Sequence, residues 1–251
     1  MGNKGTHNKA DFMKSCTLKA PDFKKCNLES IQGLFSKLAT GIAEIDVPAA
    51  DPLHIDKLRI LQGQGPVSVN ASLENVVITG FSKTKIVENR VNLKNFHFYT
   101  LMKIPKLRIE GTYDLKGRIL LVPLIGNGKC WFEPTDLDIE MRNEVNIYKR
   151  DNYHFFNVTA SKVRFNVGGL TLNLNNLFDG LKALEQSTNA YLNANWRPVS
   201  ESLRPILSQA IEDILVVLAR QVFHGVPAEF FFDDFEDYLT PNLLVSQYKE
   251  R

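Results

Sequence analysis

The longest regular hydrophobic pattern of the chain lies between residues 196 and 223. Apolar side chains recur there at intervals of three and four residues, which predicts one amphipathic helix of about seven turns. They are Val199, Leu203, Ile206, Leu207, Ala210, Ile211, Ile214, Leu215, Leu218 and Val222. Such a face is stable only when other elements cover it. Pro205 lies inside the pattern and predicts either a later helix start or a kink, and we favour the kink.

A second helical pattern begins after Asn27, whose side chain suits a helix N-cap, and runs to about Ile42. Gly41 and Pro48 favour its end near that point. Beyond Pro52 the interval between apolar residues changes from 3.6 to 2 and keeps that value for about 120 residues. This alternation predicts strands with one apolar and one polar face, which assemble into an antiparallel sheet.

The clearest alternating segments are residues 67–73, 107–115 and 137–141. Residues 170–177 predict a last strand, and a short helix is expected from Leu181 before the long one begins. No sequence period of 20 to 50 residues repeats and no linker divides the chain, so we expect one domain over residues 1–251. Residues 1–10 and 240–251 are expected to be flexible tails.

The alternation slips twice, once between Val91 and Phe96 and once between Val158 and Val163. Each slip predicts a bulge or a break, and bulges bend long strands. Residues 114–117 have the composition of a hairpin turn. We therefore predict an α+β fold in which a highly curved antiparallel sheet is wrapped around the long C-terminal helix.

Composition and charge exclude several classes of function. The 251 residues include 30 Lys and Arg against 28 Asp and Glu, a net charge of +2, so no strong field attracts nucleic acid or an anionic membrane. No run of eighteen apolar residues is present, which argues against a membrane-spanning helix. The N-terminal segment lacks the apolar core of a signal peptide, so a secreted protein would here be a mature form with a new Met start.

The cysteines and two sequence triplets indicate in which cellular compartment the protein occurs. Cys16 and Cys26 stand ten residues apart, and Cys130 stands alone. Their spacing slightly favours a disulfide between the first two, and three reduced thiols are the alternative. The triplets that begin at Asn70 and Asn157 are acceptor sequences for glycosylation, and they favour export.

Catalytic and metal-binding patterns do not emerge from the sequence. It contains no G-x-S-x-G motif, and its two Gly-x-Gly segments do not continue into a phosphate-binding loop. The five histidines show no pair at ligand spacing, and no Cys-x-x-Cys is present. We therefore expect no enzyme activity, no metal and no cofactor. The apolar residues, with 16 Phe among them, predict either a solid core or an elongated apolar channel.

The order of short motifs along the chain resembles the insect takeout and juvenile hormone binding protein family. The matching segments are Cys16 and Cys26 around a short loop, LESI (28–31), IDVP (45–48), DPL (51–53), LVPLIGNG (121–128), LNNLFDG (174–180), LNANWRP (192–198) and LRP (203–205). The resemblance spans nearly the whole chain. Cys130 has no partner for the second disulfide of the hormone-binding branch, so the chain looks more like the takeout branch. The PAEFFF segment at 227–232 departs from the family's usual ending.

This resemblance implies a secreted carrier with the tubular lipid-binding (TULIP-like) architecture, an internal hydrophobic tunnel and a disulfide between Cys16 and Cys26. The expected ligand is small, elongated and hydrophobic: a terpenoid, a fatty-acid derivative or a quinone-like lipid. The alternative is a membrane-active or microbial lipid-binding protein of the same fold. A third hypothesis is an esterase or isomerase that acts on the enclosed lipid. We expect a monomer with no nucleic-acid partner and no stable membrane insertion.

The predicted ligand contacts come from the apolar faces of the helices and strands and from two polar side chains, Tyr113 and His154, that would fix a head group. The helical contacts are Ile31, Phe35, Leu203, Leu207, Ile211 and Leu215, and the apolar sheet contacts are Phe98, Val122, Phe132 and Phe165.

Overall fold

The computed structural model describes residues 13–62, 67–92, 94–120 and 122–239. The tails expected at 1–10 and 240–251 lie outside these residues. The helices are α1 (Phe23–Thr40), α2 (Lys182–Ala194), α3 (Trp196–Gly225) and α4 (Ala228–Phe231), with short 3-10 helices η1 (Ala43–Ile45), η2 (Phe81–Lys83), η3 (Phe178–Gly180) and η4 (Phe235–Tyr238). The strands are β1 (Leu53–Gln62), β2 (Val67–Thr79), β3 (Lys85–Asn92), β4 (His97–Lys106), β5 (Arg108–Ile119), β6 (Val122–Arg150), β7 (Tyr153–Asn166) and β8 (Gly169–Leu174).

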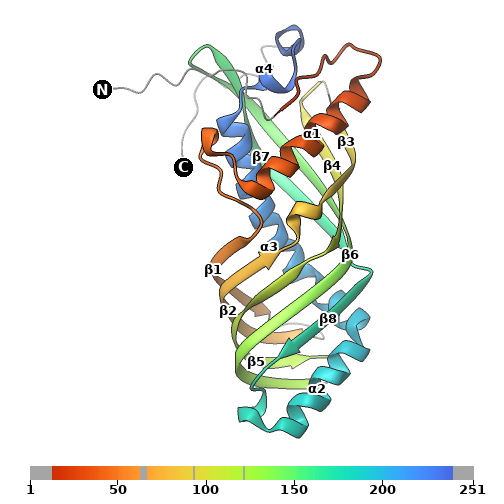
Figure 1. Cartoon of the computed structure of the whole chain (residues 1–251), viewed down its shortest axis with the longest axis vertical. Coiled ribbons are helices and arrows are strands. Elements are labelled where there is room, and N and C mark those ends of the chain that lie inside the picture. The colour runs from red at the N-terminus through yellow and green to blue at the C-terminus, as the bar shows by residue number, and fades with distance from the viewer. Residues whose placement is uncertain (1–12, 63–66, 93, 121, 240–251) are drawn as a thin grey trace, which may run out of the picture.

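The sheet is organised around β6, a strand of 29 residues that runs along most of the molecule (Figure 1). On one side β5 and then β4 pair with it antiparallel in one continuous register, and Leu107 joins them by donating its N–H to the Pro134 carbonyl at 3.1 Å. On the other side β8 and β7 pair with it in the same way. Strands β2 and β1 extend the sheet beyond β5, and β3 extends it beyond β4.

Irregular pairing bends the sheet where the sequence predicted it. The register between β6 and β7 shifts at Glu144 and Val145, opposite the slip between Val158 and Val163, so a bulge forms there. The slip between Val91 and Phe96 is a break, because β3 ends at Asn92 and β4 begins at His97. The predicted antiparallel, curved sheet is thus confirmed.

The turn predicted at 114–117 was wrong, since these residues lie inside β5. Tyr113, Leu115 and Ile119 are buried while Asp114 and Lys116 are exposed, so the alternation continues through the segment. Pairing with both β2 and β6 outweighs the turn-favouring composition of the four residues. Strand β5 instead continues to Ile119, which is the antiparallel register partner of Val122 at the start of β6.

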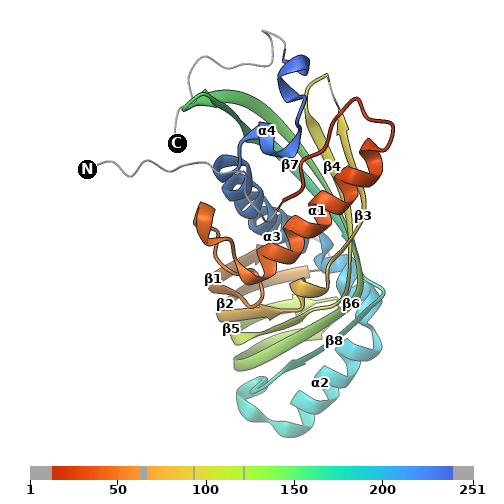
Figure 2. The same cartoon turned by 45° about the horizontal axis from the view of Figure 1, so that its top comes forward.

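Helix α3 runs along the inner face of the sheet (Figures 1 and 2). It begins at Trp196 and passes through Pro205, which excludes a later start. Two of its side chains bond to the backbone of β7: Arg204 Nη1 donates to the Phe165 carbonyl at 2.9 Å, and Glu212 Oε2 accepts from the Val163 N–H at 3.1 Å. The helix therefore covers the polar edge of β7 as well as the apolar face of the sheet.

The other helices cover further strand edges in the same manner. At one end of the molecule, Gln32 of α1 accepts from the Ile86 N–H and donates to the Thr84 carbonyl, at 2.8 and 3.0 Å. At the opposite end, α2 lies against β8. We call these regions the α1 end, built from α1, β3, β4, β7, α4 and the C-terminal half of α3, and the α2 end, built from β2, β5, β8, α2 and the first turns of α3.

Candidate ligand-binding site

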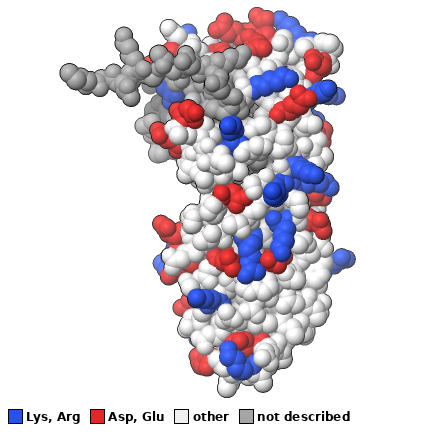
Figure 3. Space-filling view, viewed as in Figure 1, with Lys and Arg blue, Asp and Glu red and all other residues white. Residues whose placement is uncertain are grey.

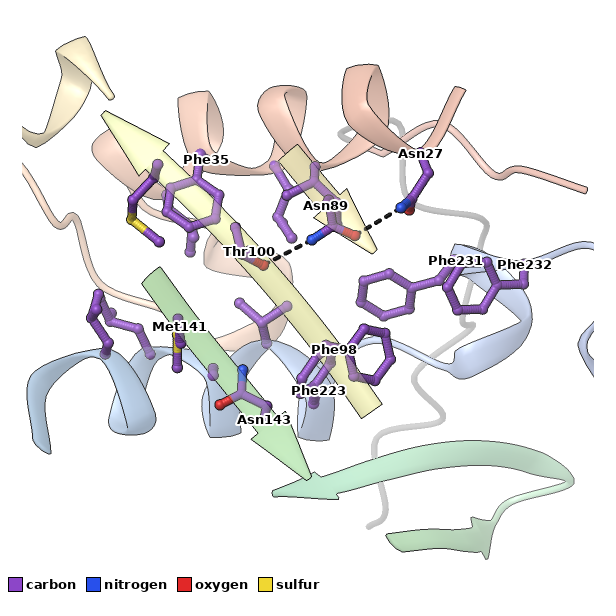
Figure 4. A pocket seen from close by; sticks show the side chains of 18 residues that line it. Asn27, Phe35, Asn89, Phe98, Thr100, Met141, Asn143, Phe223, Phe231 and Phe232 are labelled. Carbon is purple, nitrogen blue, oxygen red and sulfur yellow. Dashed lines mark hydrogen bonds between the residues drawn. The ribbon is translucent and has the colours of Figure 1, made fainter. Parts of the chain in front are cut away.

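A cavity of about 90 Å³ lies at the α1 end, where α1 and the C-terminal half of α3 lie on the same side of the sheet (Figures 2 and 4). Eighteen residues line it: Asn27, Ile31, Leu34, Phe35, Leu38, Asn89, Phe98, Thr100, Met102, Met141, Asn143, Leu215, Leu218, Ala219, Val222, Phe223, Phe231 and Phe232.

The periodicity of each element explains which residues reach the cavity. Helix α1 contributes positions three and four residues apart, such as Asn27, Ile31 and Leu34. Helix α3 does the same from Leu215 onward. On β4 every second residue from Phe98 to Met102 lines the cavity, because successive side chains of a strand point to opposite faces.

Aromatic rings form one wall of the cavity. The ring centroids of Phe98 and Phe223 are 5.0 Å apart, and those of Phe223 and Phe231 are 5.7 Å apart in an edge-on arrangement. Such contacts stabilise the wall beyond its burial. The residues come from β4, from α3 and from α4, so this wall joins three elements (Figure 4).

The segment that precedes α1 holds α4 beside the cavity through backbone hydrogen bonds. Cys16 donates its N–H to the Phe231 carbonyl at 3.0 Å and accepts from the Asp233 N–H at 3.1 Å. Cys16 is also joined to Cys26 of α1 by a disulfide with an S–S distance of 2.05 Å. The bridge that the resemblance implied is therefore present, and it ties α1, the N-terminal segment and α4 together beside the cavity.

Four polar side chains line the otherwise apolar cavity. Asn27 Nδ2 donates to Asn89 Oδ1 at 2.7 Å, and Asn89 Nδ2 donates to Thr100 Oγ1 at 2.8 Å, as Figure 4 shows. All three residues are buried. The fourth, Asn143 on β6, is only 5% exposed, and its Oδ1 atom has no hydrogen-bond partner among the described residues.

The eighteen described lining residues include no charged side chain. An ionised group placed among them would lose its hydration without gaining a counter-ion, which is unfavourable. An apolar chain that ends in a neutral polar group fits the same surface, because the side-chain amides and the hydroxyl can form hydrogen bonds with it. The site is therefore suited to binding a neutral hydrophobic molecule.

The structure brings four of the predicted contact residues to this cavity: Ile31, Phe35, Phe98 and Leu215. The others lie elsewhere in the hydrophobic interior. Leu203, Val122 and Phe132 pack at the α2 end, while Phe165, Leu207 and Ile211 pack in the middle of the molecule. The role of these residues as ligand contacts remains a prediction.

The two predicted head-group residues already have partners away from the cavity. The Tyr113 hydroxyl donates to the Asn175 carbonyl at 2.8 Å, and burial raises the pKa of this phenol. His154 Nδ1 lies 2.7 Å from Glu229 Oε1, and its backbone N–H donates to the same carboxylate at 3.0 Å. The contact between His154 and Glu229 thus attaches α4 to the start of β7.

His154 and Glu229 also form a group with Glu236, in which one potential ligand atom of each side chain lies within 4.8 Å of the others. A metal could in principle use such a set. The bond between His154 and Glu229 already explains why two of the three side chains are close, so the group has a structural role without an ion.

Sequence reasoning missed the polar part of the site. Asn89, Thr100 and Asn143 lie on strands, and polar residues of an alternating strand are normally assigned to the outer face. A usable signal was present for Thr100, since it shares the parity of Phe98 and Met102. The shared parity with Phe98 would also have predicted Met102 as a lining residue.

The predicted modification sites and the third cysteine occupy different environments. Asn70 on β2 is exposed and Asn157 on β7 is half-buried, and glycosylation of either remains a prediction. Cys130 is buried at the α2 end, its Sγ lies 3.6 Å from the Gly111 carbonyl oxygen, and burial raises the pKa of its thiol to about 11. None of the helices in the described part of the chain is long and apolar enough to span a membrane.

A curved antiparallel sheet around a long helix, with an apolar cavity between them, places the protein in the class of tubular lipid-binding folds. A solved structure, Takeout 1 of Epiphyas postvittana, superimposes on it with a TM-score of 0.76 over 88% of this chain and 99% of the other, at 20% identity. A sequence model described as Haemolymph juvenile hormone binding protein (JHBP) matches residues 3–233. The chain therefore belongs to the JHBP family, whose members are binding proteins.

Individual relatives match over similar lengths. The circadian clock-controlled protein daywake of Drosophila yakuba is 25% identical over 232 residues, which cover 88% of this chain and 86% of the relative. A protein of Schistocerca gregaria, provisionally described as beta-carotene-binding, is 22% identical over 220 residues, which cover 85% of each chain.

Proposed function

We propose that this protein is a secreted carrier that holds a small, elongated hydrophobic ligand with its apolar body in the cavity between α1 and α3. A terpenoid, a fatty-acid derivative or a quinone-like lipid has the required chemistry. The observation that carries the proposal is the lining itself, which is apolar apart from four neutral polar side chains and lies in the interior of the fold. The family description and the name of the Schistocerca relative both concern hydrophobic ligands, which supports the same class.

The cavity must expand to accept such a ligand. At about 90 Å³ it is smaller than an engineered protein cavity of about 150 Å³ that holds a benzene molecule. Met102 and Met141 line the cavity, and unbranched, flexible methionine side chains adapt readily to a new neighbour. A ligand that buries a few hundred Å² of apolar surface gains about 5–10 kcal/mol before ordering costs, which is enough to displace side chains.

The surface charge supports a soluble carrier over a membrane-active protein. On the face shown in Figure 3, basic and acidic side chains are interspersed. Ion pairs between neighbouring strands include Lys57 with Glu74 and Lys103 with Asp138. Binding to an anionic membrane is favoured by a concentration of basic charge, which the face in Figure 3 does not show and the net charge of +2 does not favour. The disulfide between Cys16 and Cys26 is typical of proteins in an oxidising, extracellular environment.

Binding of an apolar fluorescent probe to the purified protein tests the proposal, together with native mass spectrometry and organic extraction of any ligand carried along. In Ala219→Phe the new benzyl group points into the cavity, and we expect probe affinity to fall at least tenfold. Val217→Phe is the matched control, because Val217 lies on the same helix and is 54% exposed. Wild-type protein that binds no apolar probe and carries no lipid would contradict the carrier function. Equal affinity of both variants would place the ligand elsewhere.

A further inference from the structure

Two buried polar atoms without a hydrogen-bond partner in the described part of the chain lie side by side in the sheet. They are Oδ1 of Asn143 on β6 and Oγ of Ser161 on β7. The two residues are direct register partners, so their side chains project from the same face of the sheet, with Cβ atoms about 4.5–5.5 Å apart. Phe98 on β4 is the register partner of Asn143 on its other side.

This arrangement differs from the polar chain next to it. Asn27, Asn89 and Thr100 bond to one another, so their burial is compensated. Asn143 lines the same cavity beside Phe98 and Phe223 (Figure 4) and has no compensating partner for its carbonyl oxygen among the described residues. A buried acceptor without a donor destabilises the folded protein, and a bound group that donates a hydrogen bond removes that cost.

We propose that Asn143 and Ser161 form the binding site for a neutral hydroxyl group at one end of the hydrophobic ligand. The hydroxyl donates its hydrogen to Asn143 Oδ1 and accepts a hydrogen bond from the Ser161 hydroxyl, which uses both capacities of an alcohol oxygen. The apolar body of the ligand then extends along the rings of Phe98 and Phe223. This inference rests on the proposed carrier function and narrows it to alcohols.

Other head groups satisfy the two atoms less well. A carboxylate carries only acceptors, so it cannot donate to the Asn143 oxygen, whose partial negative charge repels it. No cationic side chain occurs among the described lining residues to neutralise it. A ketone, ester or ether can accept from Ser161 but cannot donate to Asn143. A hydrocarbon leaves both atoms unpaired. The expected order of affinity is therefore alcohol first and charged molecules last.

Competition against an apolar fluorescent probe, using decan-1-ol, 1-fluorodecane and decanoate, tests this order at pH 7.5. The fluoroalkane has nearly the shape of the alcohol but donates no hydrogen bond. For the wild-type protein we expect decan-1-ol to bind about five- to tenfold more tightly than 1-fluorodecane, the effect of one buried hydrogen bond. Decanoate should bind more weakly than both and should gain affinity as the pH falls towards the range in which it becomes neutral.

Three variants locate the effect. Asn143→Leu keeps the same number of side-chain heavy atoms in the same branched arrangement, and we expect it to abolish the preference for the alcohol while 1-fluorodecane still binds. Ser161→Ala should reduce the preference without abolishing it. Asn146→Leu is the matched control, because Asn146 is an exposed residue of the same strand, and the preference should be unchanged.

The possible outcomes separate this inference from the carrier function. Equal affinity of alcohol and fluoroalkane for the wild-type protein would overturn the hydroxyl site and would indicate that a bound water satisfies both atoms, while the carrier function would stand. Failure of all three compounds and of the probe to bind would contradict the carrier function itself. Should Asn143→Leu not fold, judged by circular dichroism, the wild-type comparison and Ser161→Ala still decide the question.

Discussion

Asn189 at the α2 end and Asn143 at the α1 end are both buried, and they differ in whether the side-chain amide is fully hydrogen-bonded. At the α2 end, Asn189 accepts from the Leu174 N–H and donates to the Leu174 carbonyl, at 2.9 and 3.0 Å. Asn193, one turn later, does the same with Leu172, at 2.8 and 2.9 Å. The side-chain amides of α2 thus replace a neighbouring strand along the edge of β8. At the α1 end, Asn143 lines a cavity with its carbonyl oxygen unpaired among the described residues.

The difference shows which end of the fold is suited to stability and which to binding. Paired amides at the α2 end satisfy backbone groups that would otherwise be buried without partners, so their loss affects the folded state directly. At the α1 end a polar atom and a cavity are both kept in the folded protein, and each lowers stability in the absence of a ligand. Replacing Asn189 and replacing Asn143 with leucine should therefore change the free energy of unfolding in opposite directions.

The largest expected effect is that of Asn189→Leu at the α2 end. The substitution leaves the N–H and the carbonyl of Leu174 without partners, which should lower the free energy of unfolding by about 2–4 kcal/mol. Chemical denaturation measures this loss. Gln186→Leu, at an exposed position of the same helix, is the control and should change stability by less than about 0.5 kcal/mol. Affinity for the apolar probe should be unchanged in both variants, and a drop in affinity for Asn189→Leu would argue against independent ends.

Next in size is the double substitution Cys16→Ser with Cys26→Ser at the α1 end. Opening a loop of ten residues should lower the free energy of unfolding by about 2–3 kcal/mol. Unlike the change in α2, it should also weaken probe binding, because the Cys16 backbone holds α4 and its residue Phe231 against the cavity. Hydrogen exchange should show faster exchange of the backbone amides at positions 16 and 233 than in the wild-type protein. Undiminished probe binding would show that the wall formed by α4 does not depend on the bridge.

Asn143→Leu should have a smaller effect on stability, and of the opposite sign. Replacing the unpaired amide with an apolar group of the same branched shape should raise the free energy of unfolding by about 1 kcal/mol in the absence of ligand. The denaturation midpoint of the ligand-free protein measures this gain. A loss of stability instead would mean that Asn143 has a partner in solution, and the contrast between the two ends would then weaken.

Most of the fold could be predicted from the sequence because hydrophobic spacing records which face of an element is covered. The helix over 196–223 and the strand parity slips at 91–96 and 158–163 are read in this way. The length of β6 and the joining of β4 with β5 could not be read, since the pattern within one strand does not report the register with its neighbours. The prediction of a turn at 114–117 was wrong for the same reason.

The binding site was less predictable than the fold. Leu203, Leu207, Ile211 and Leu215 share one face of α3, yet among them only Leu215 lines the cavity. Periodicity identifies the face of a helix, but the position along it where packing is loose depends on what lies opposite. Likewise Phe132 and Asn143 belong to the same strand, and they contact different ends of the molecule because β6 spans both.

The smallest expected effect concerns Cys130, whose reactivity reports how tightly the α2 end is packed. Burial raises the pKa of its thiol to about 11, so at pH 8 very little of the reactive thiolate forms, and the side chain is shielded as well. At pH 8 a water-soluble disulfide reagent should label no thiol in the folded protein and one per chain after unfolding. The rate of labelling should rise as the pH approaches 11.

The variant Thr100→Cys supplies the comparison, because its new thiol faces the cavity at the α1 end. We expect a small apolar maleimide to label position 100 in the folded protein at a rate that an apolar ligand reduces. Equal labelling of both thiols would mean that the two ends open to the same extent, and the assignment of binding to the α1 end would lose its basis.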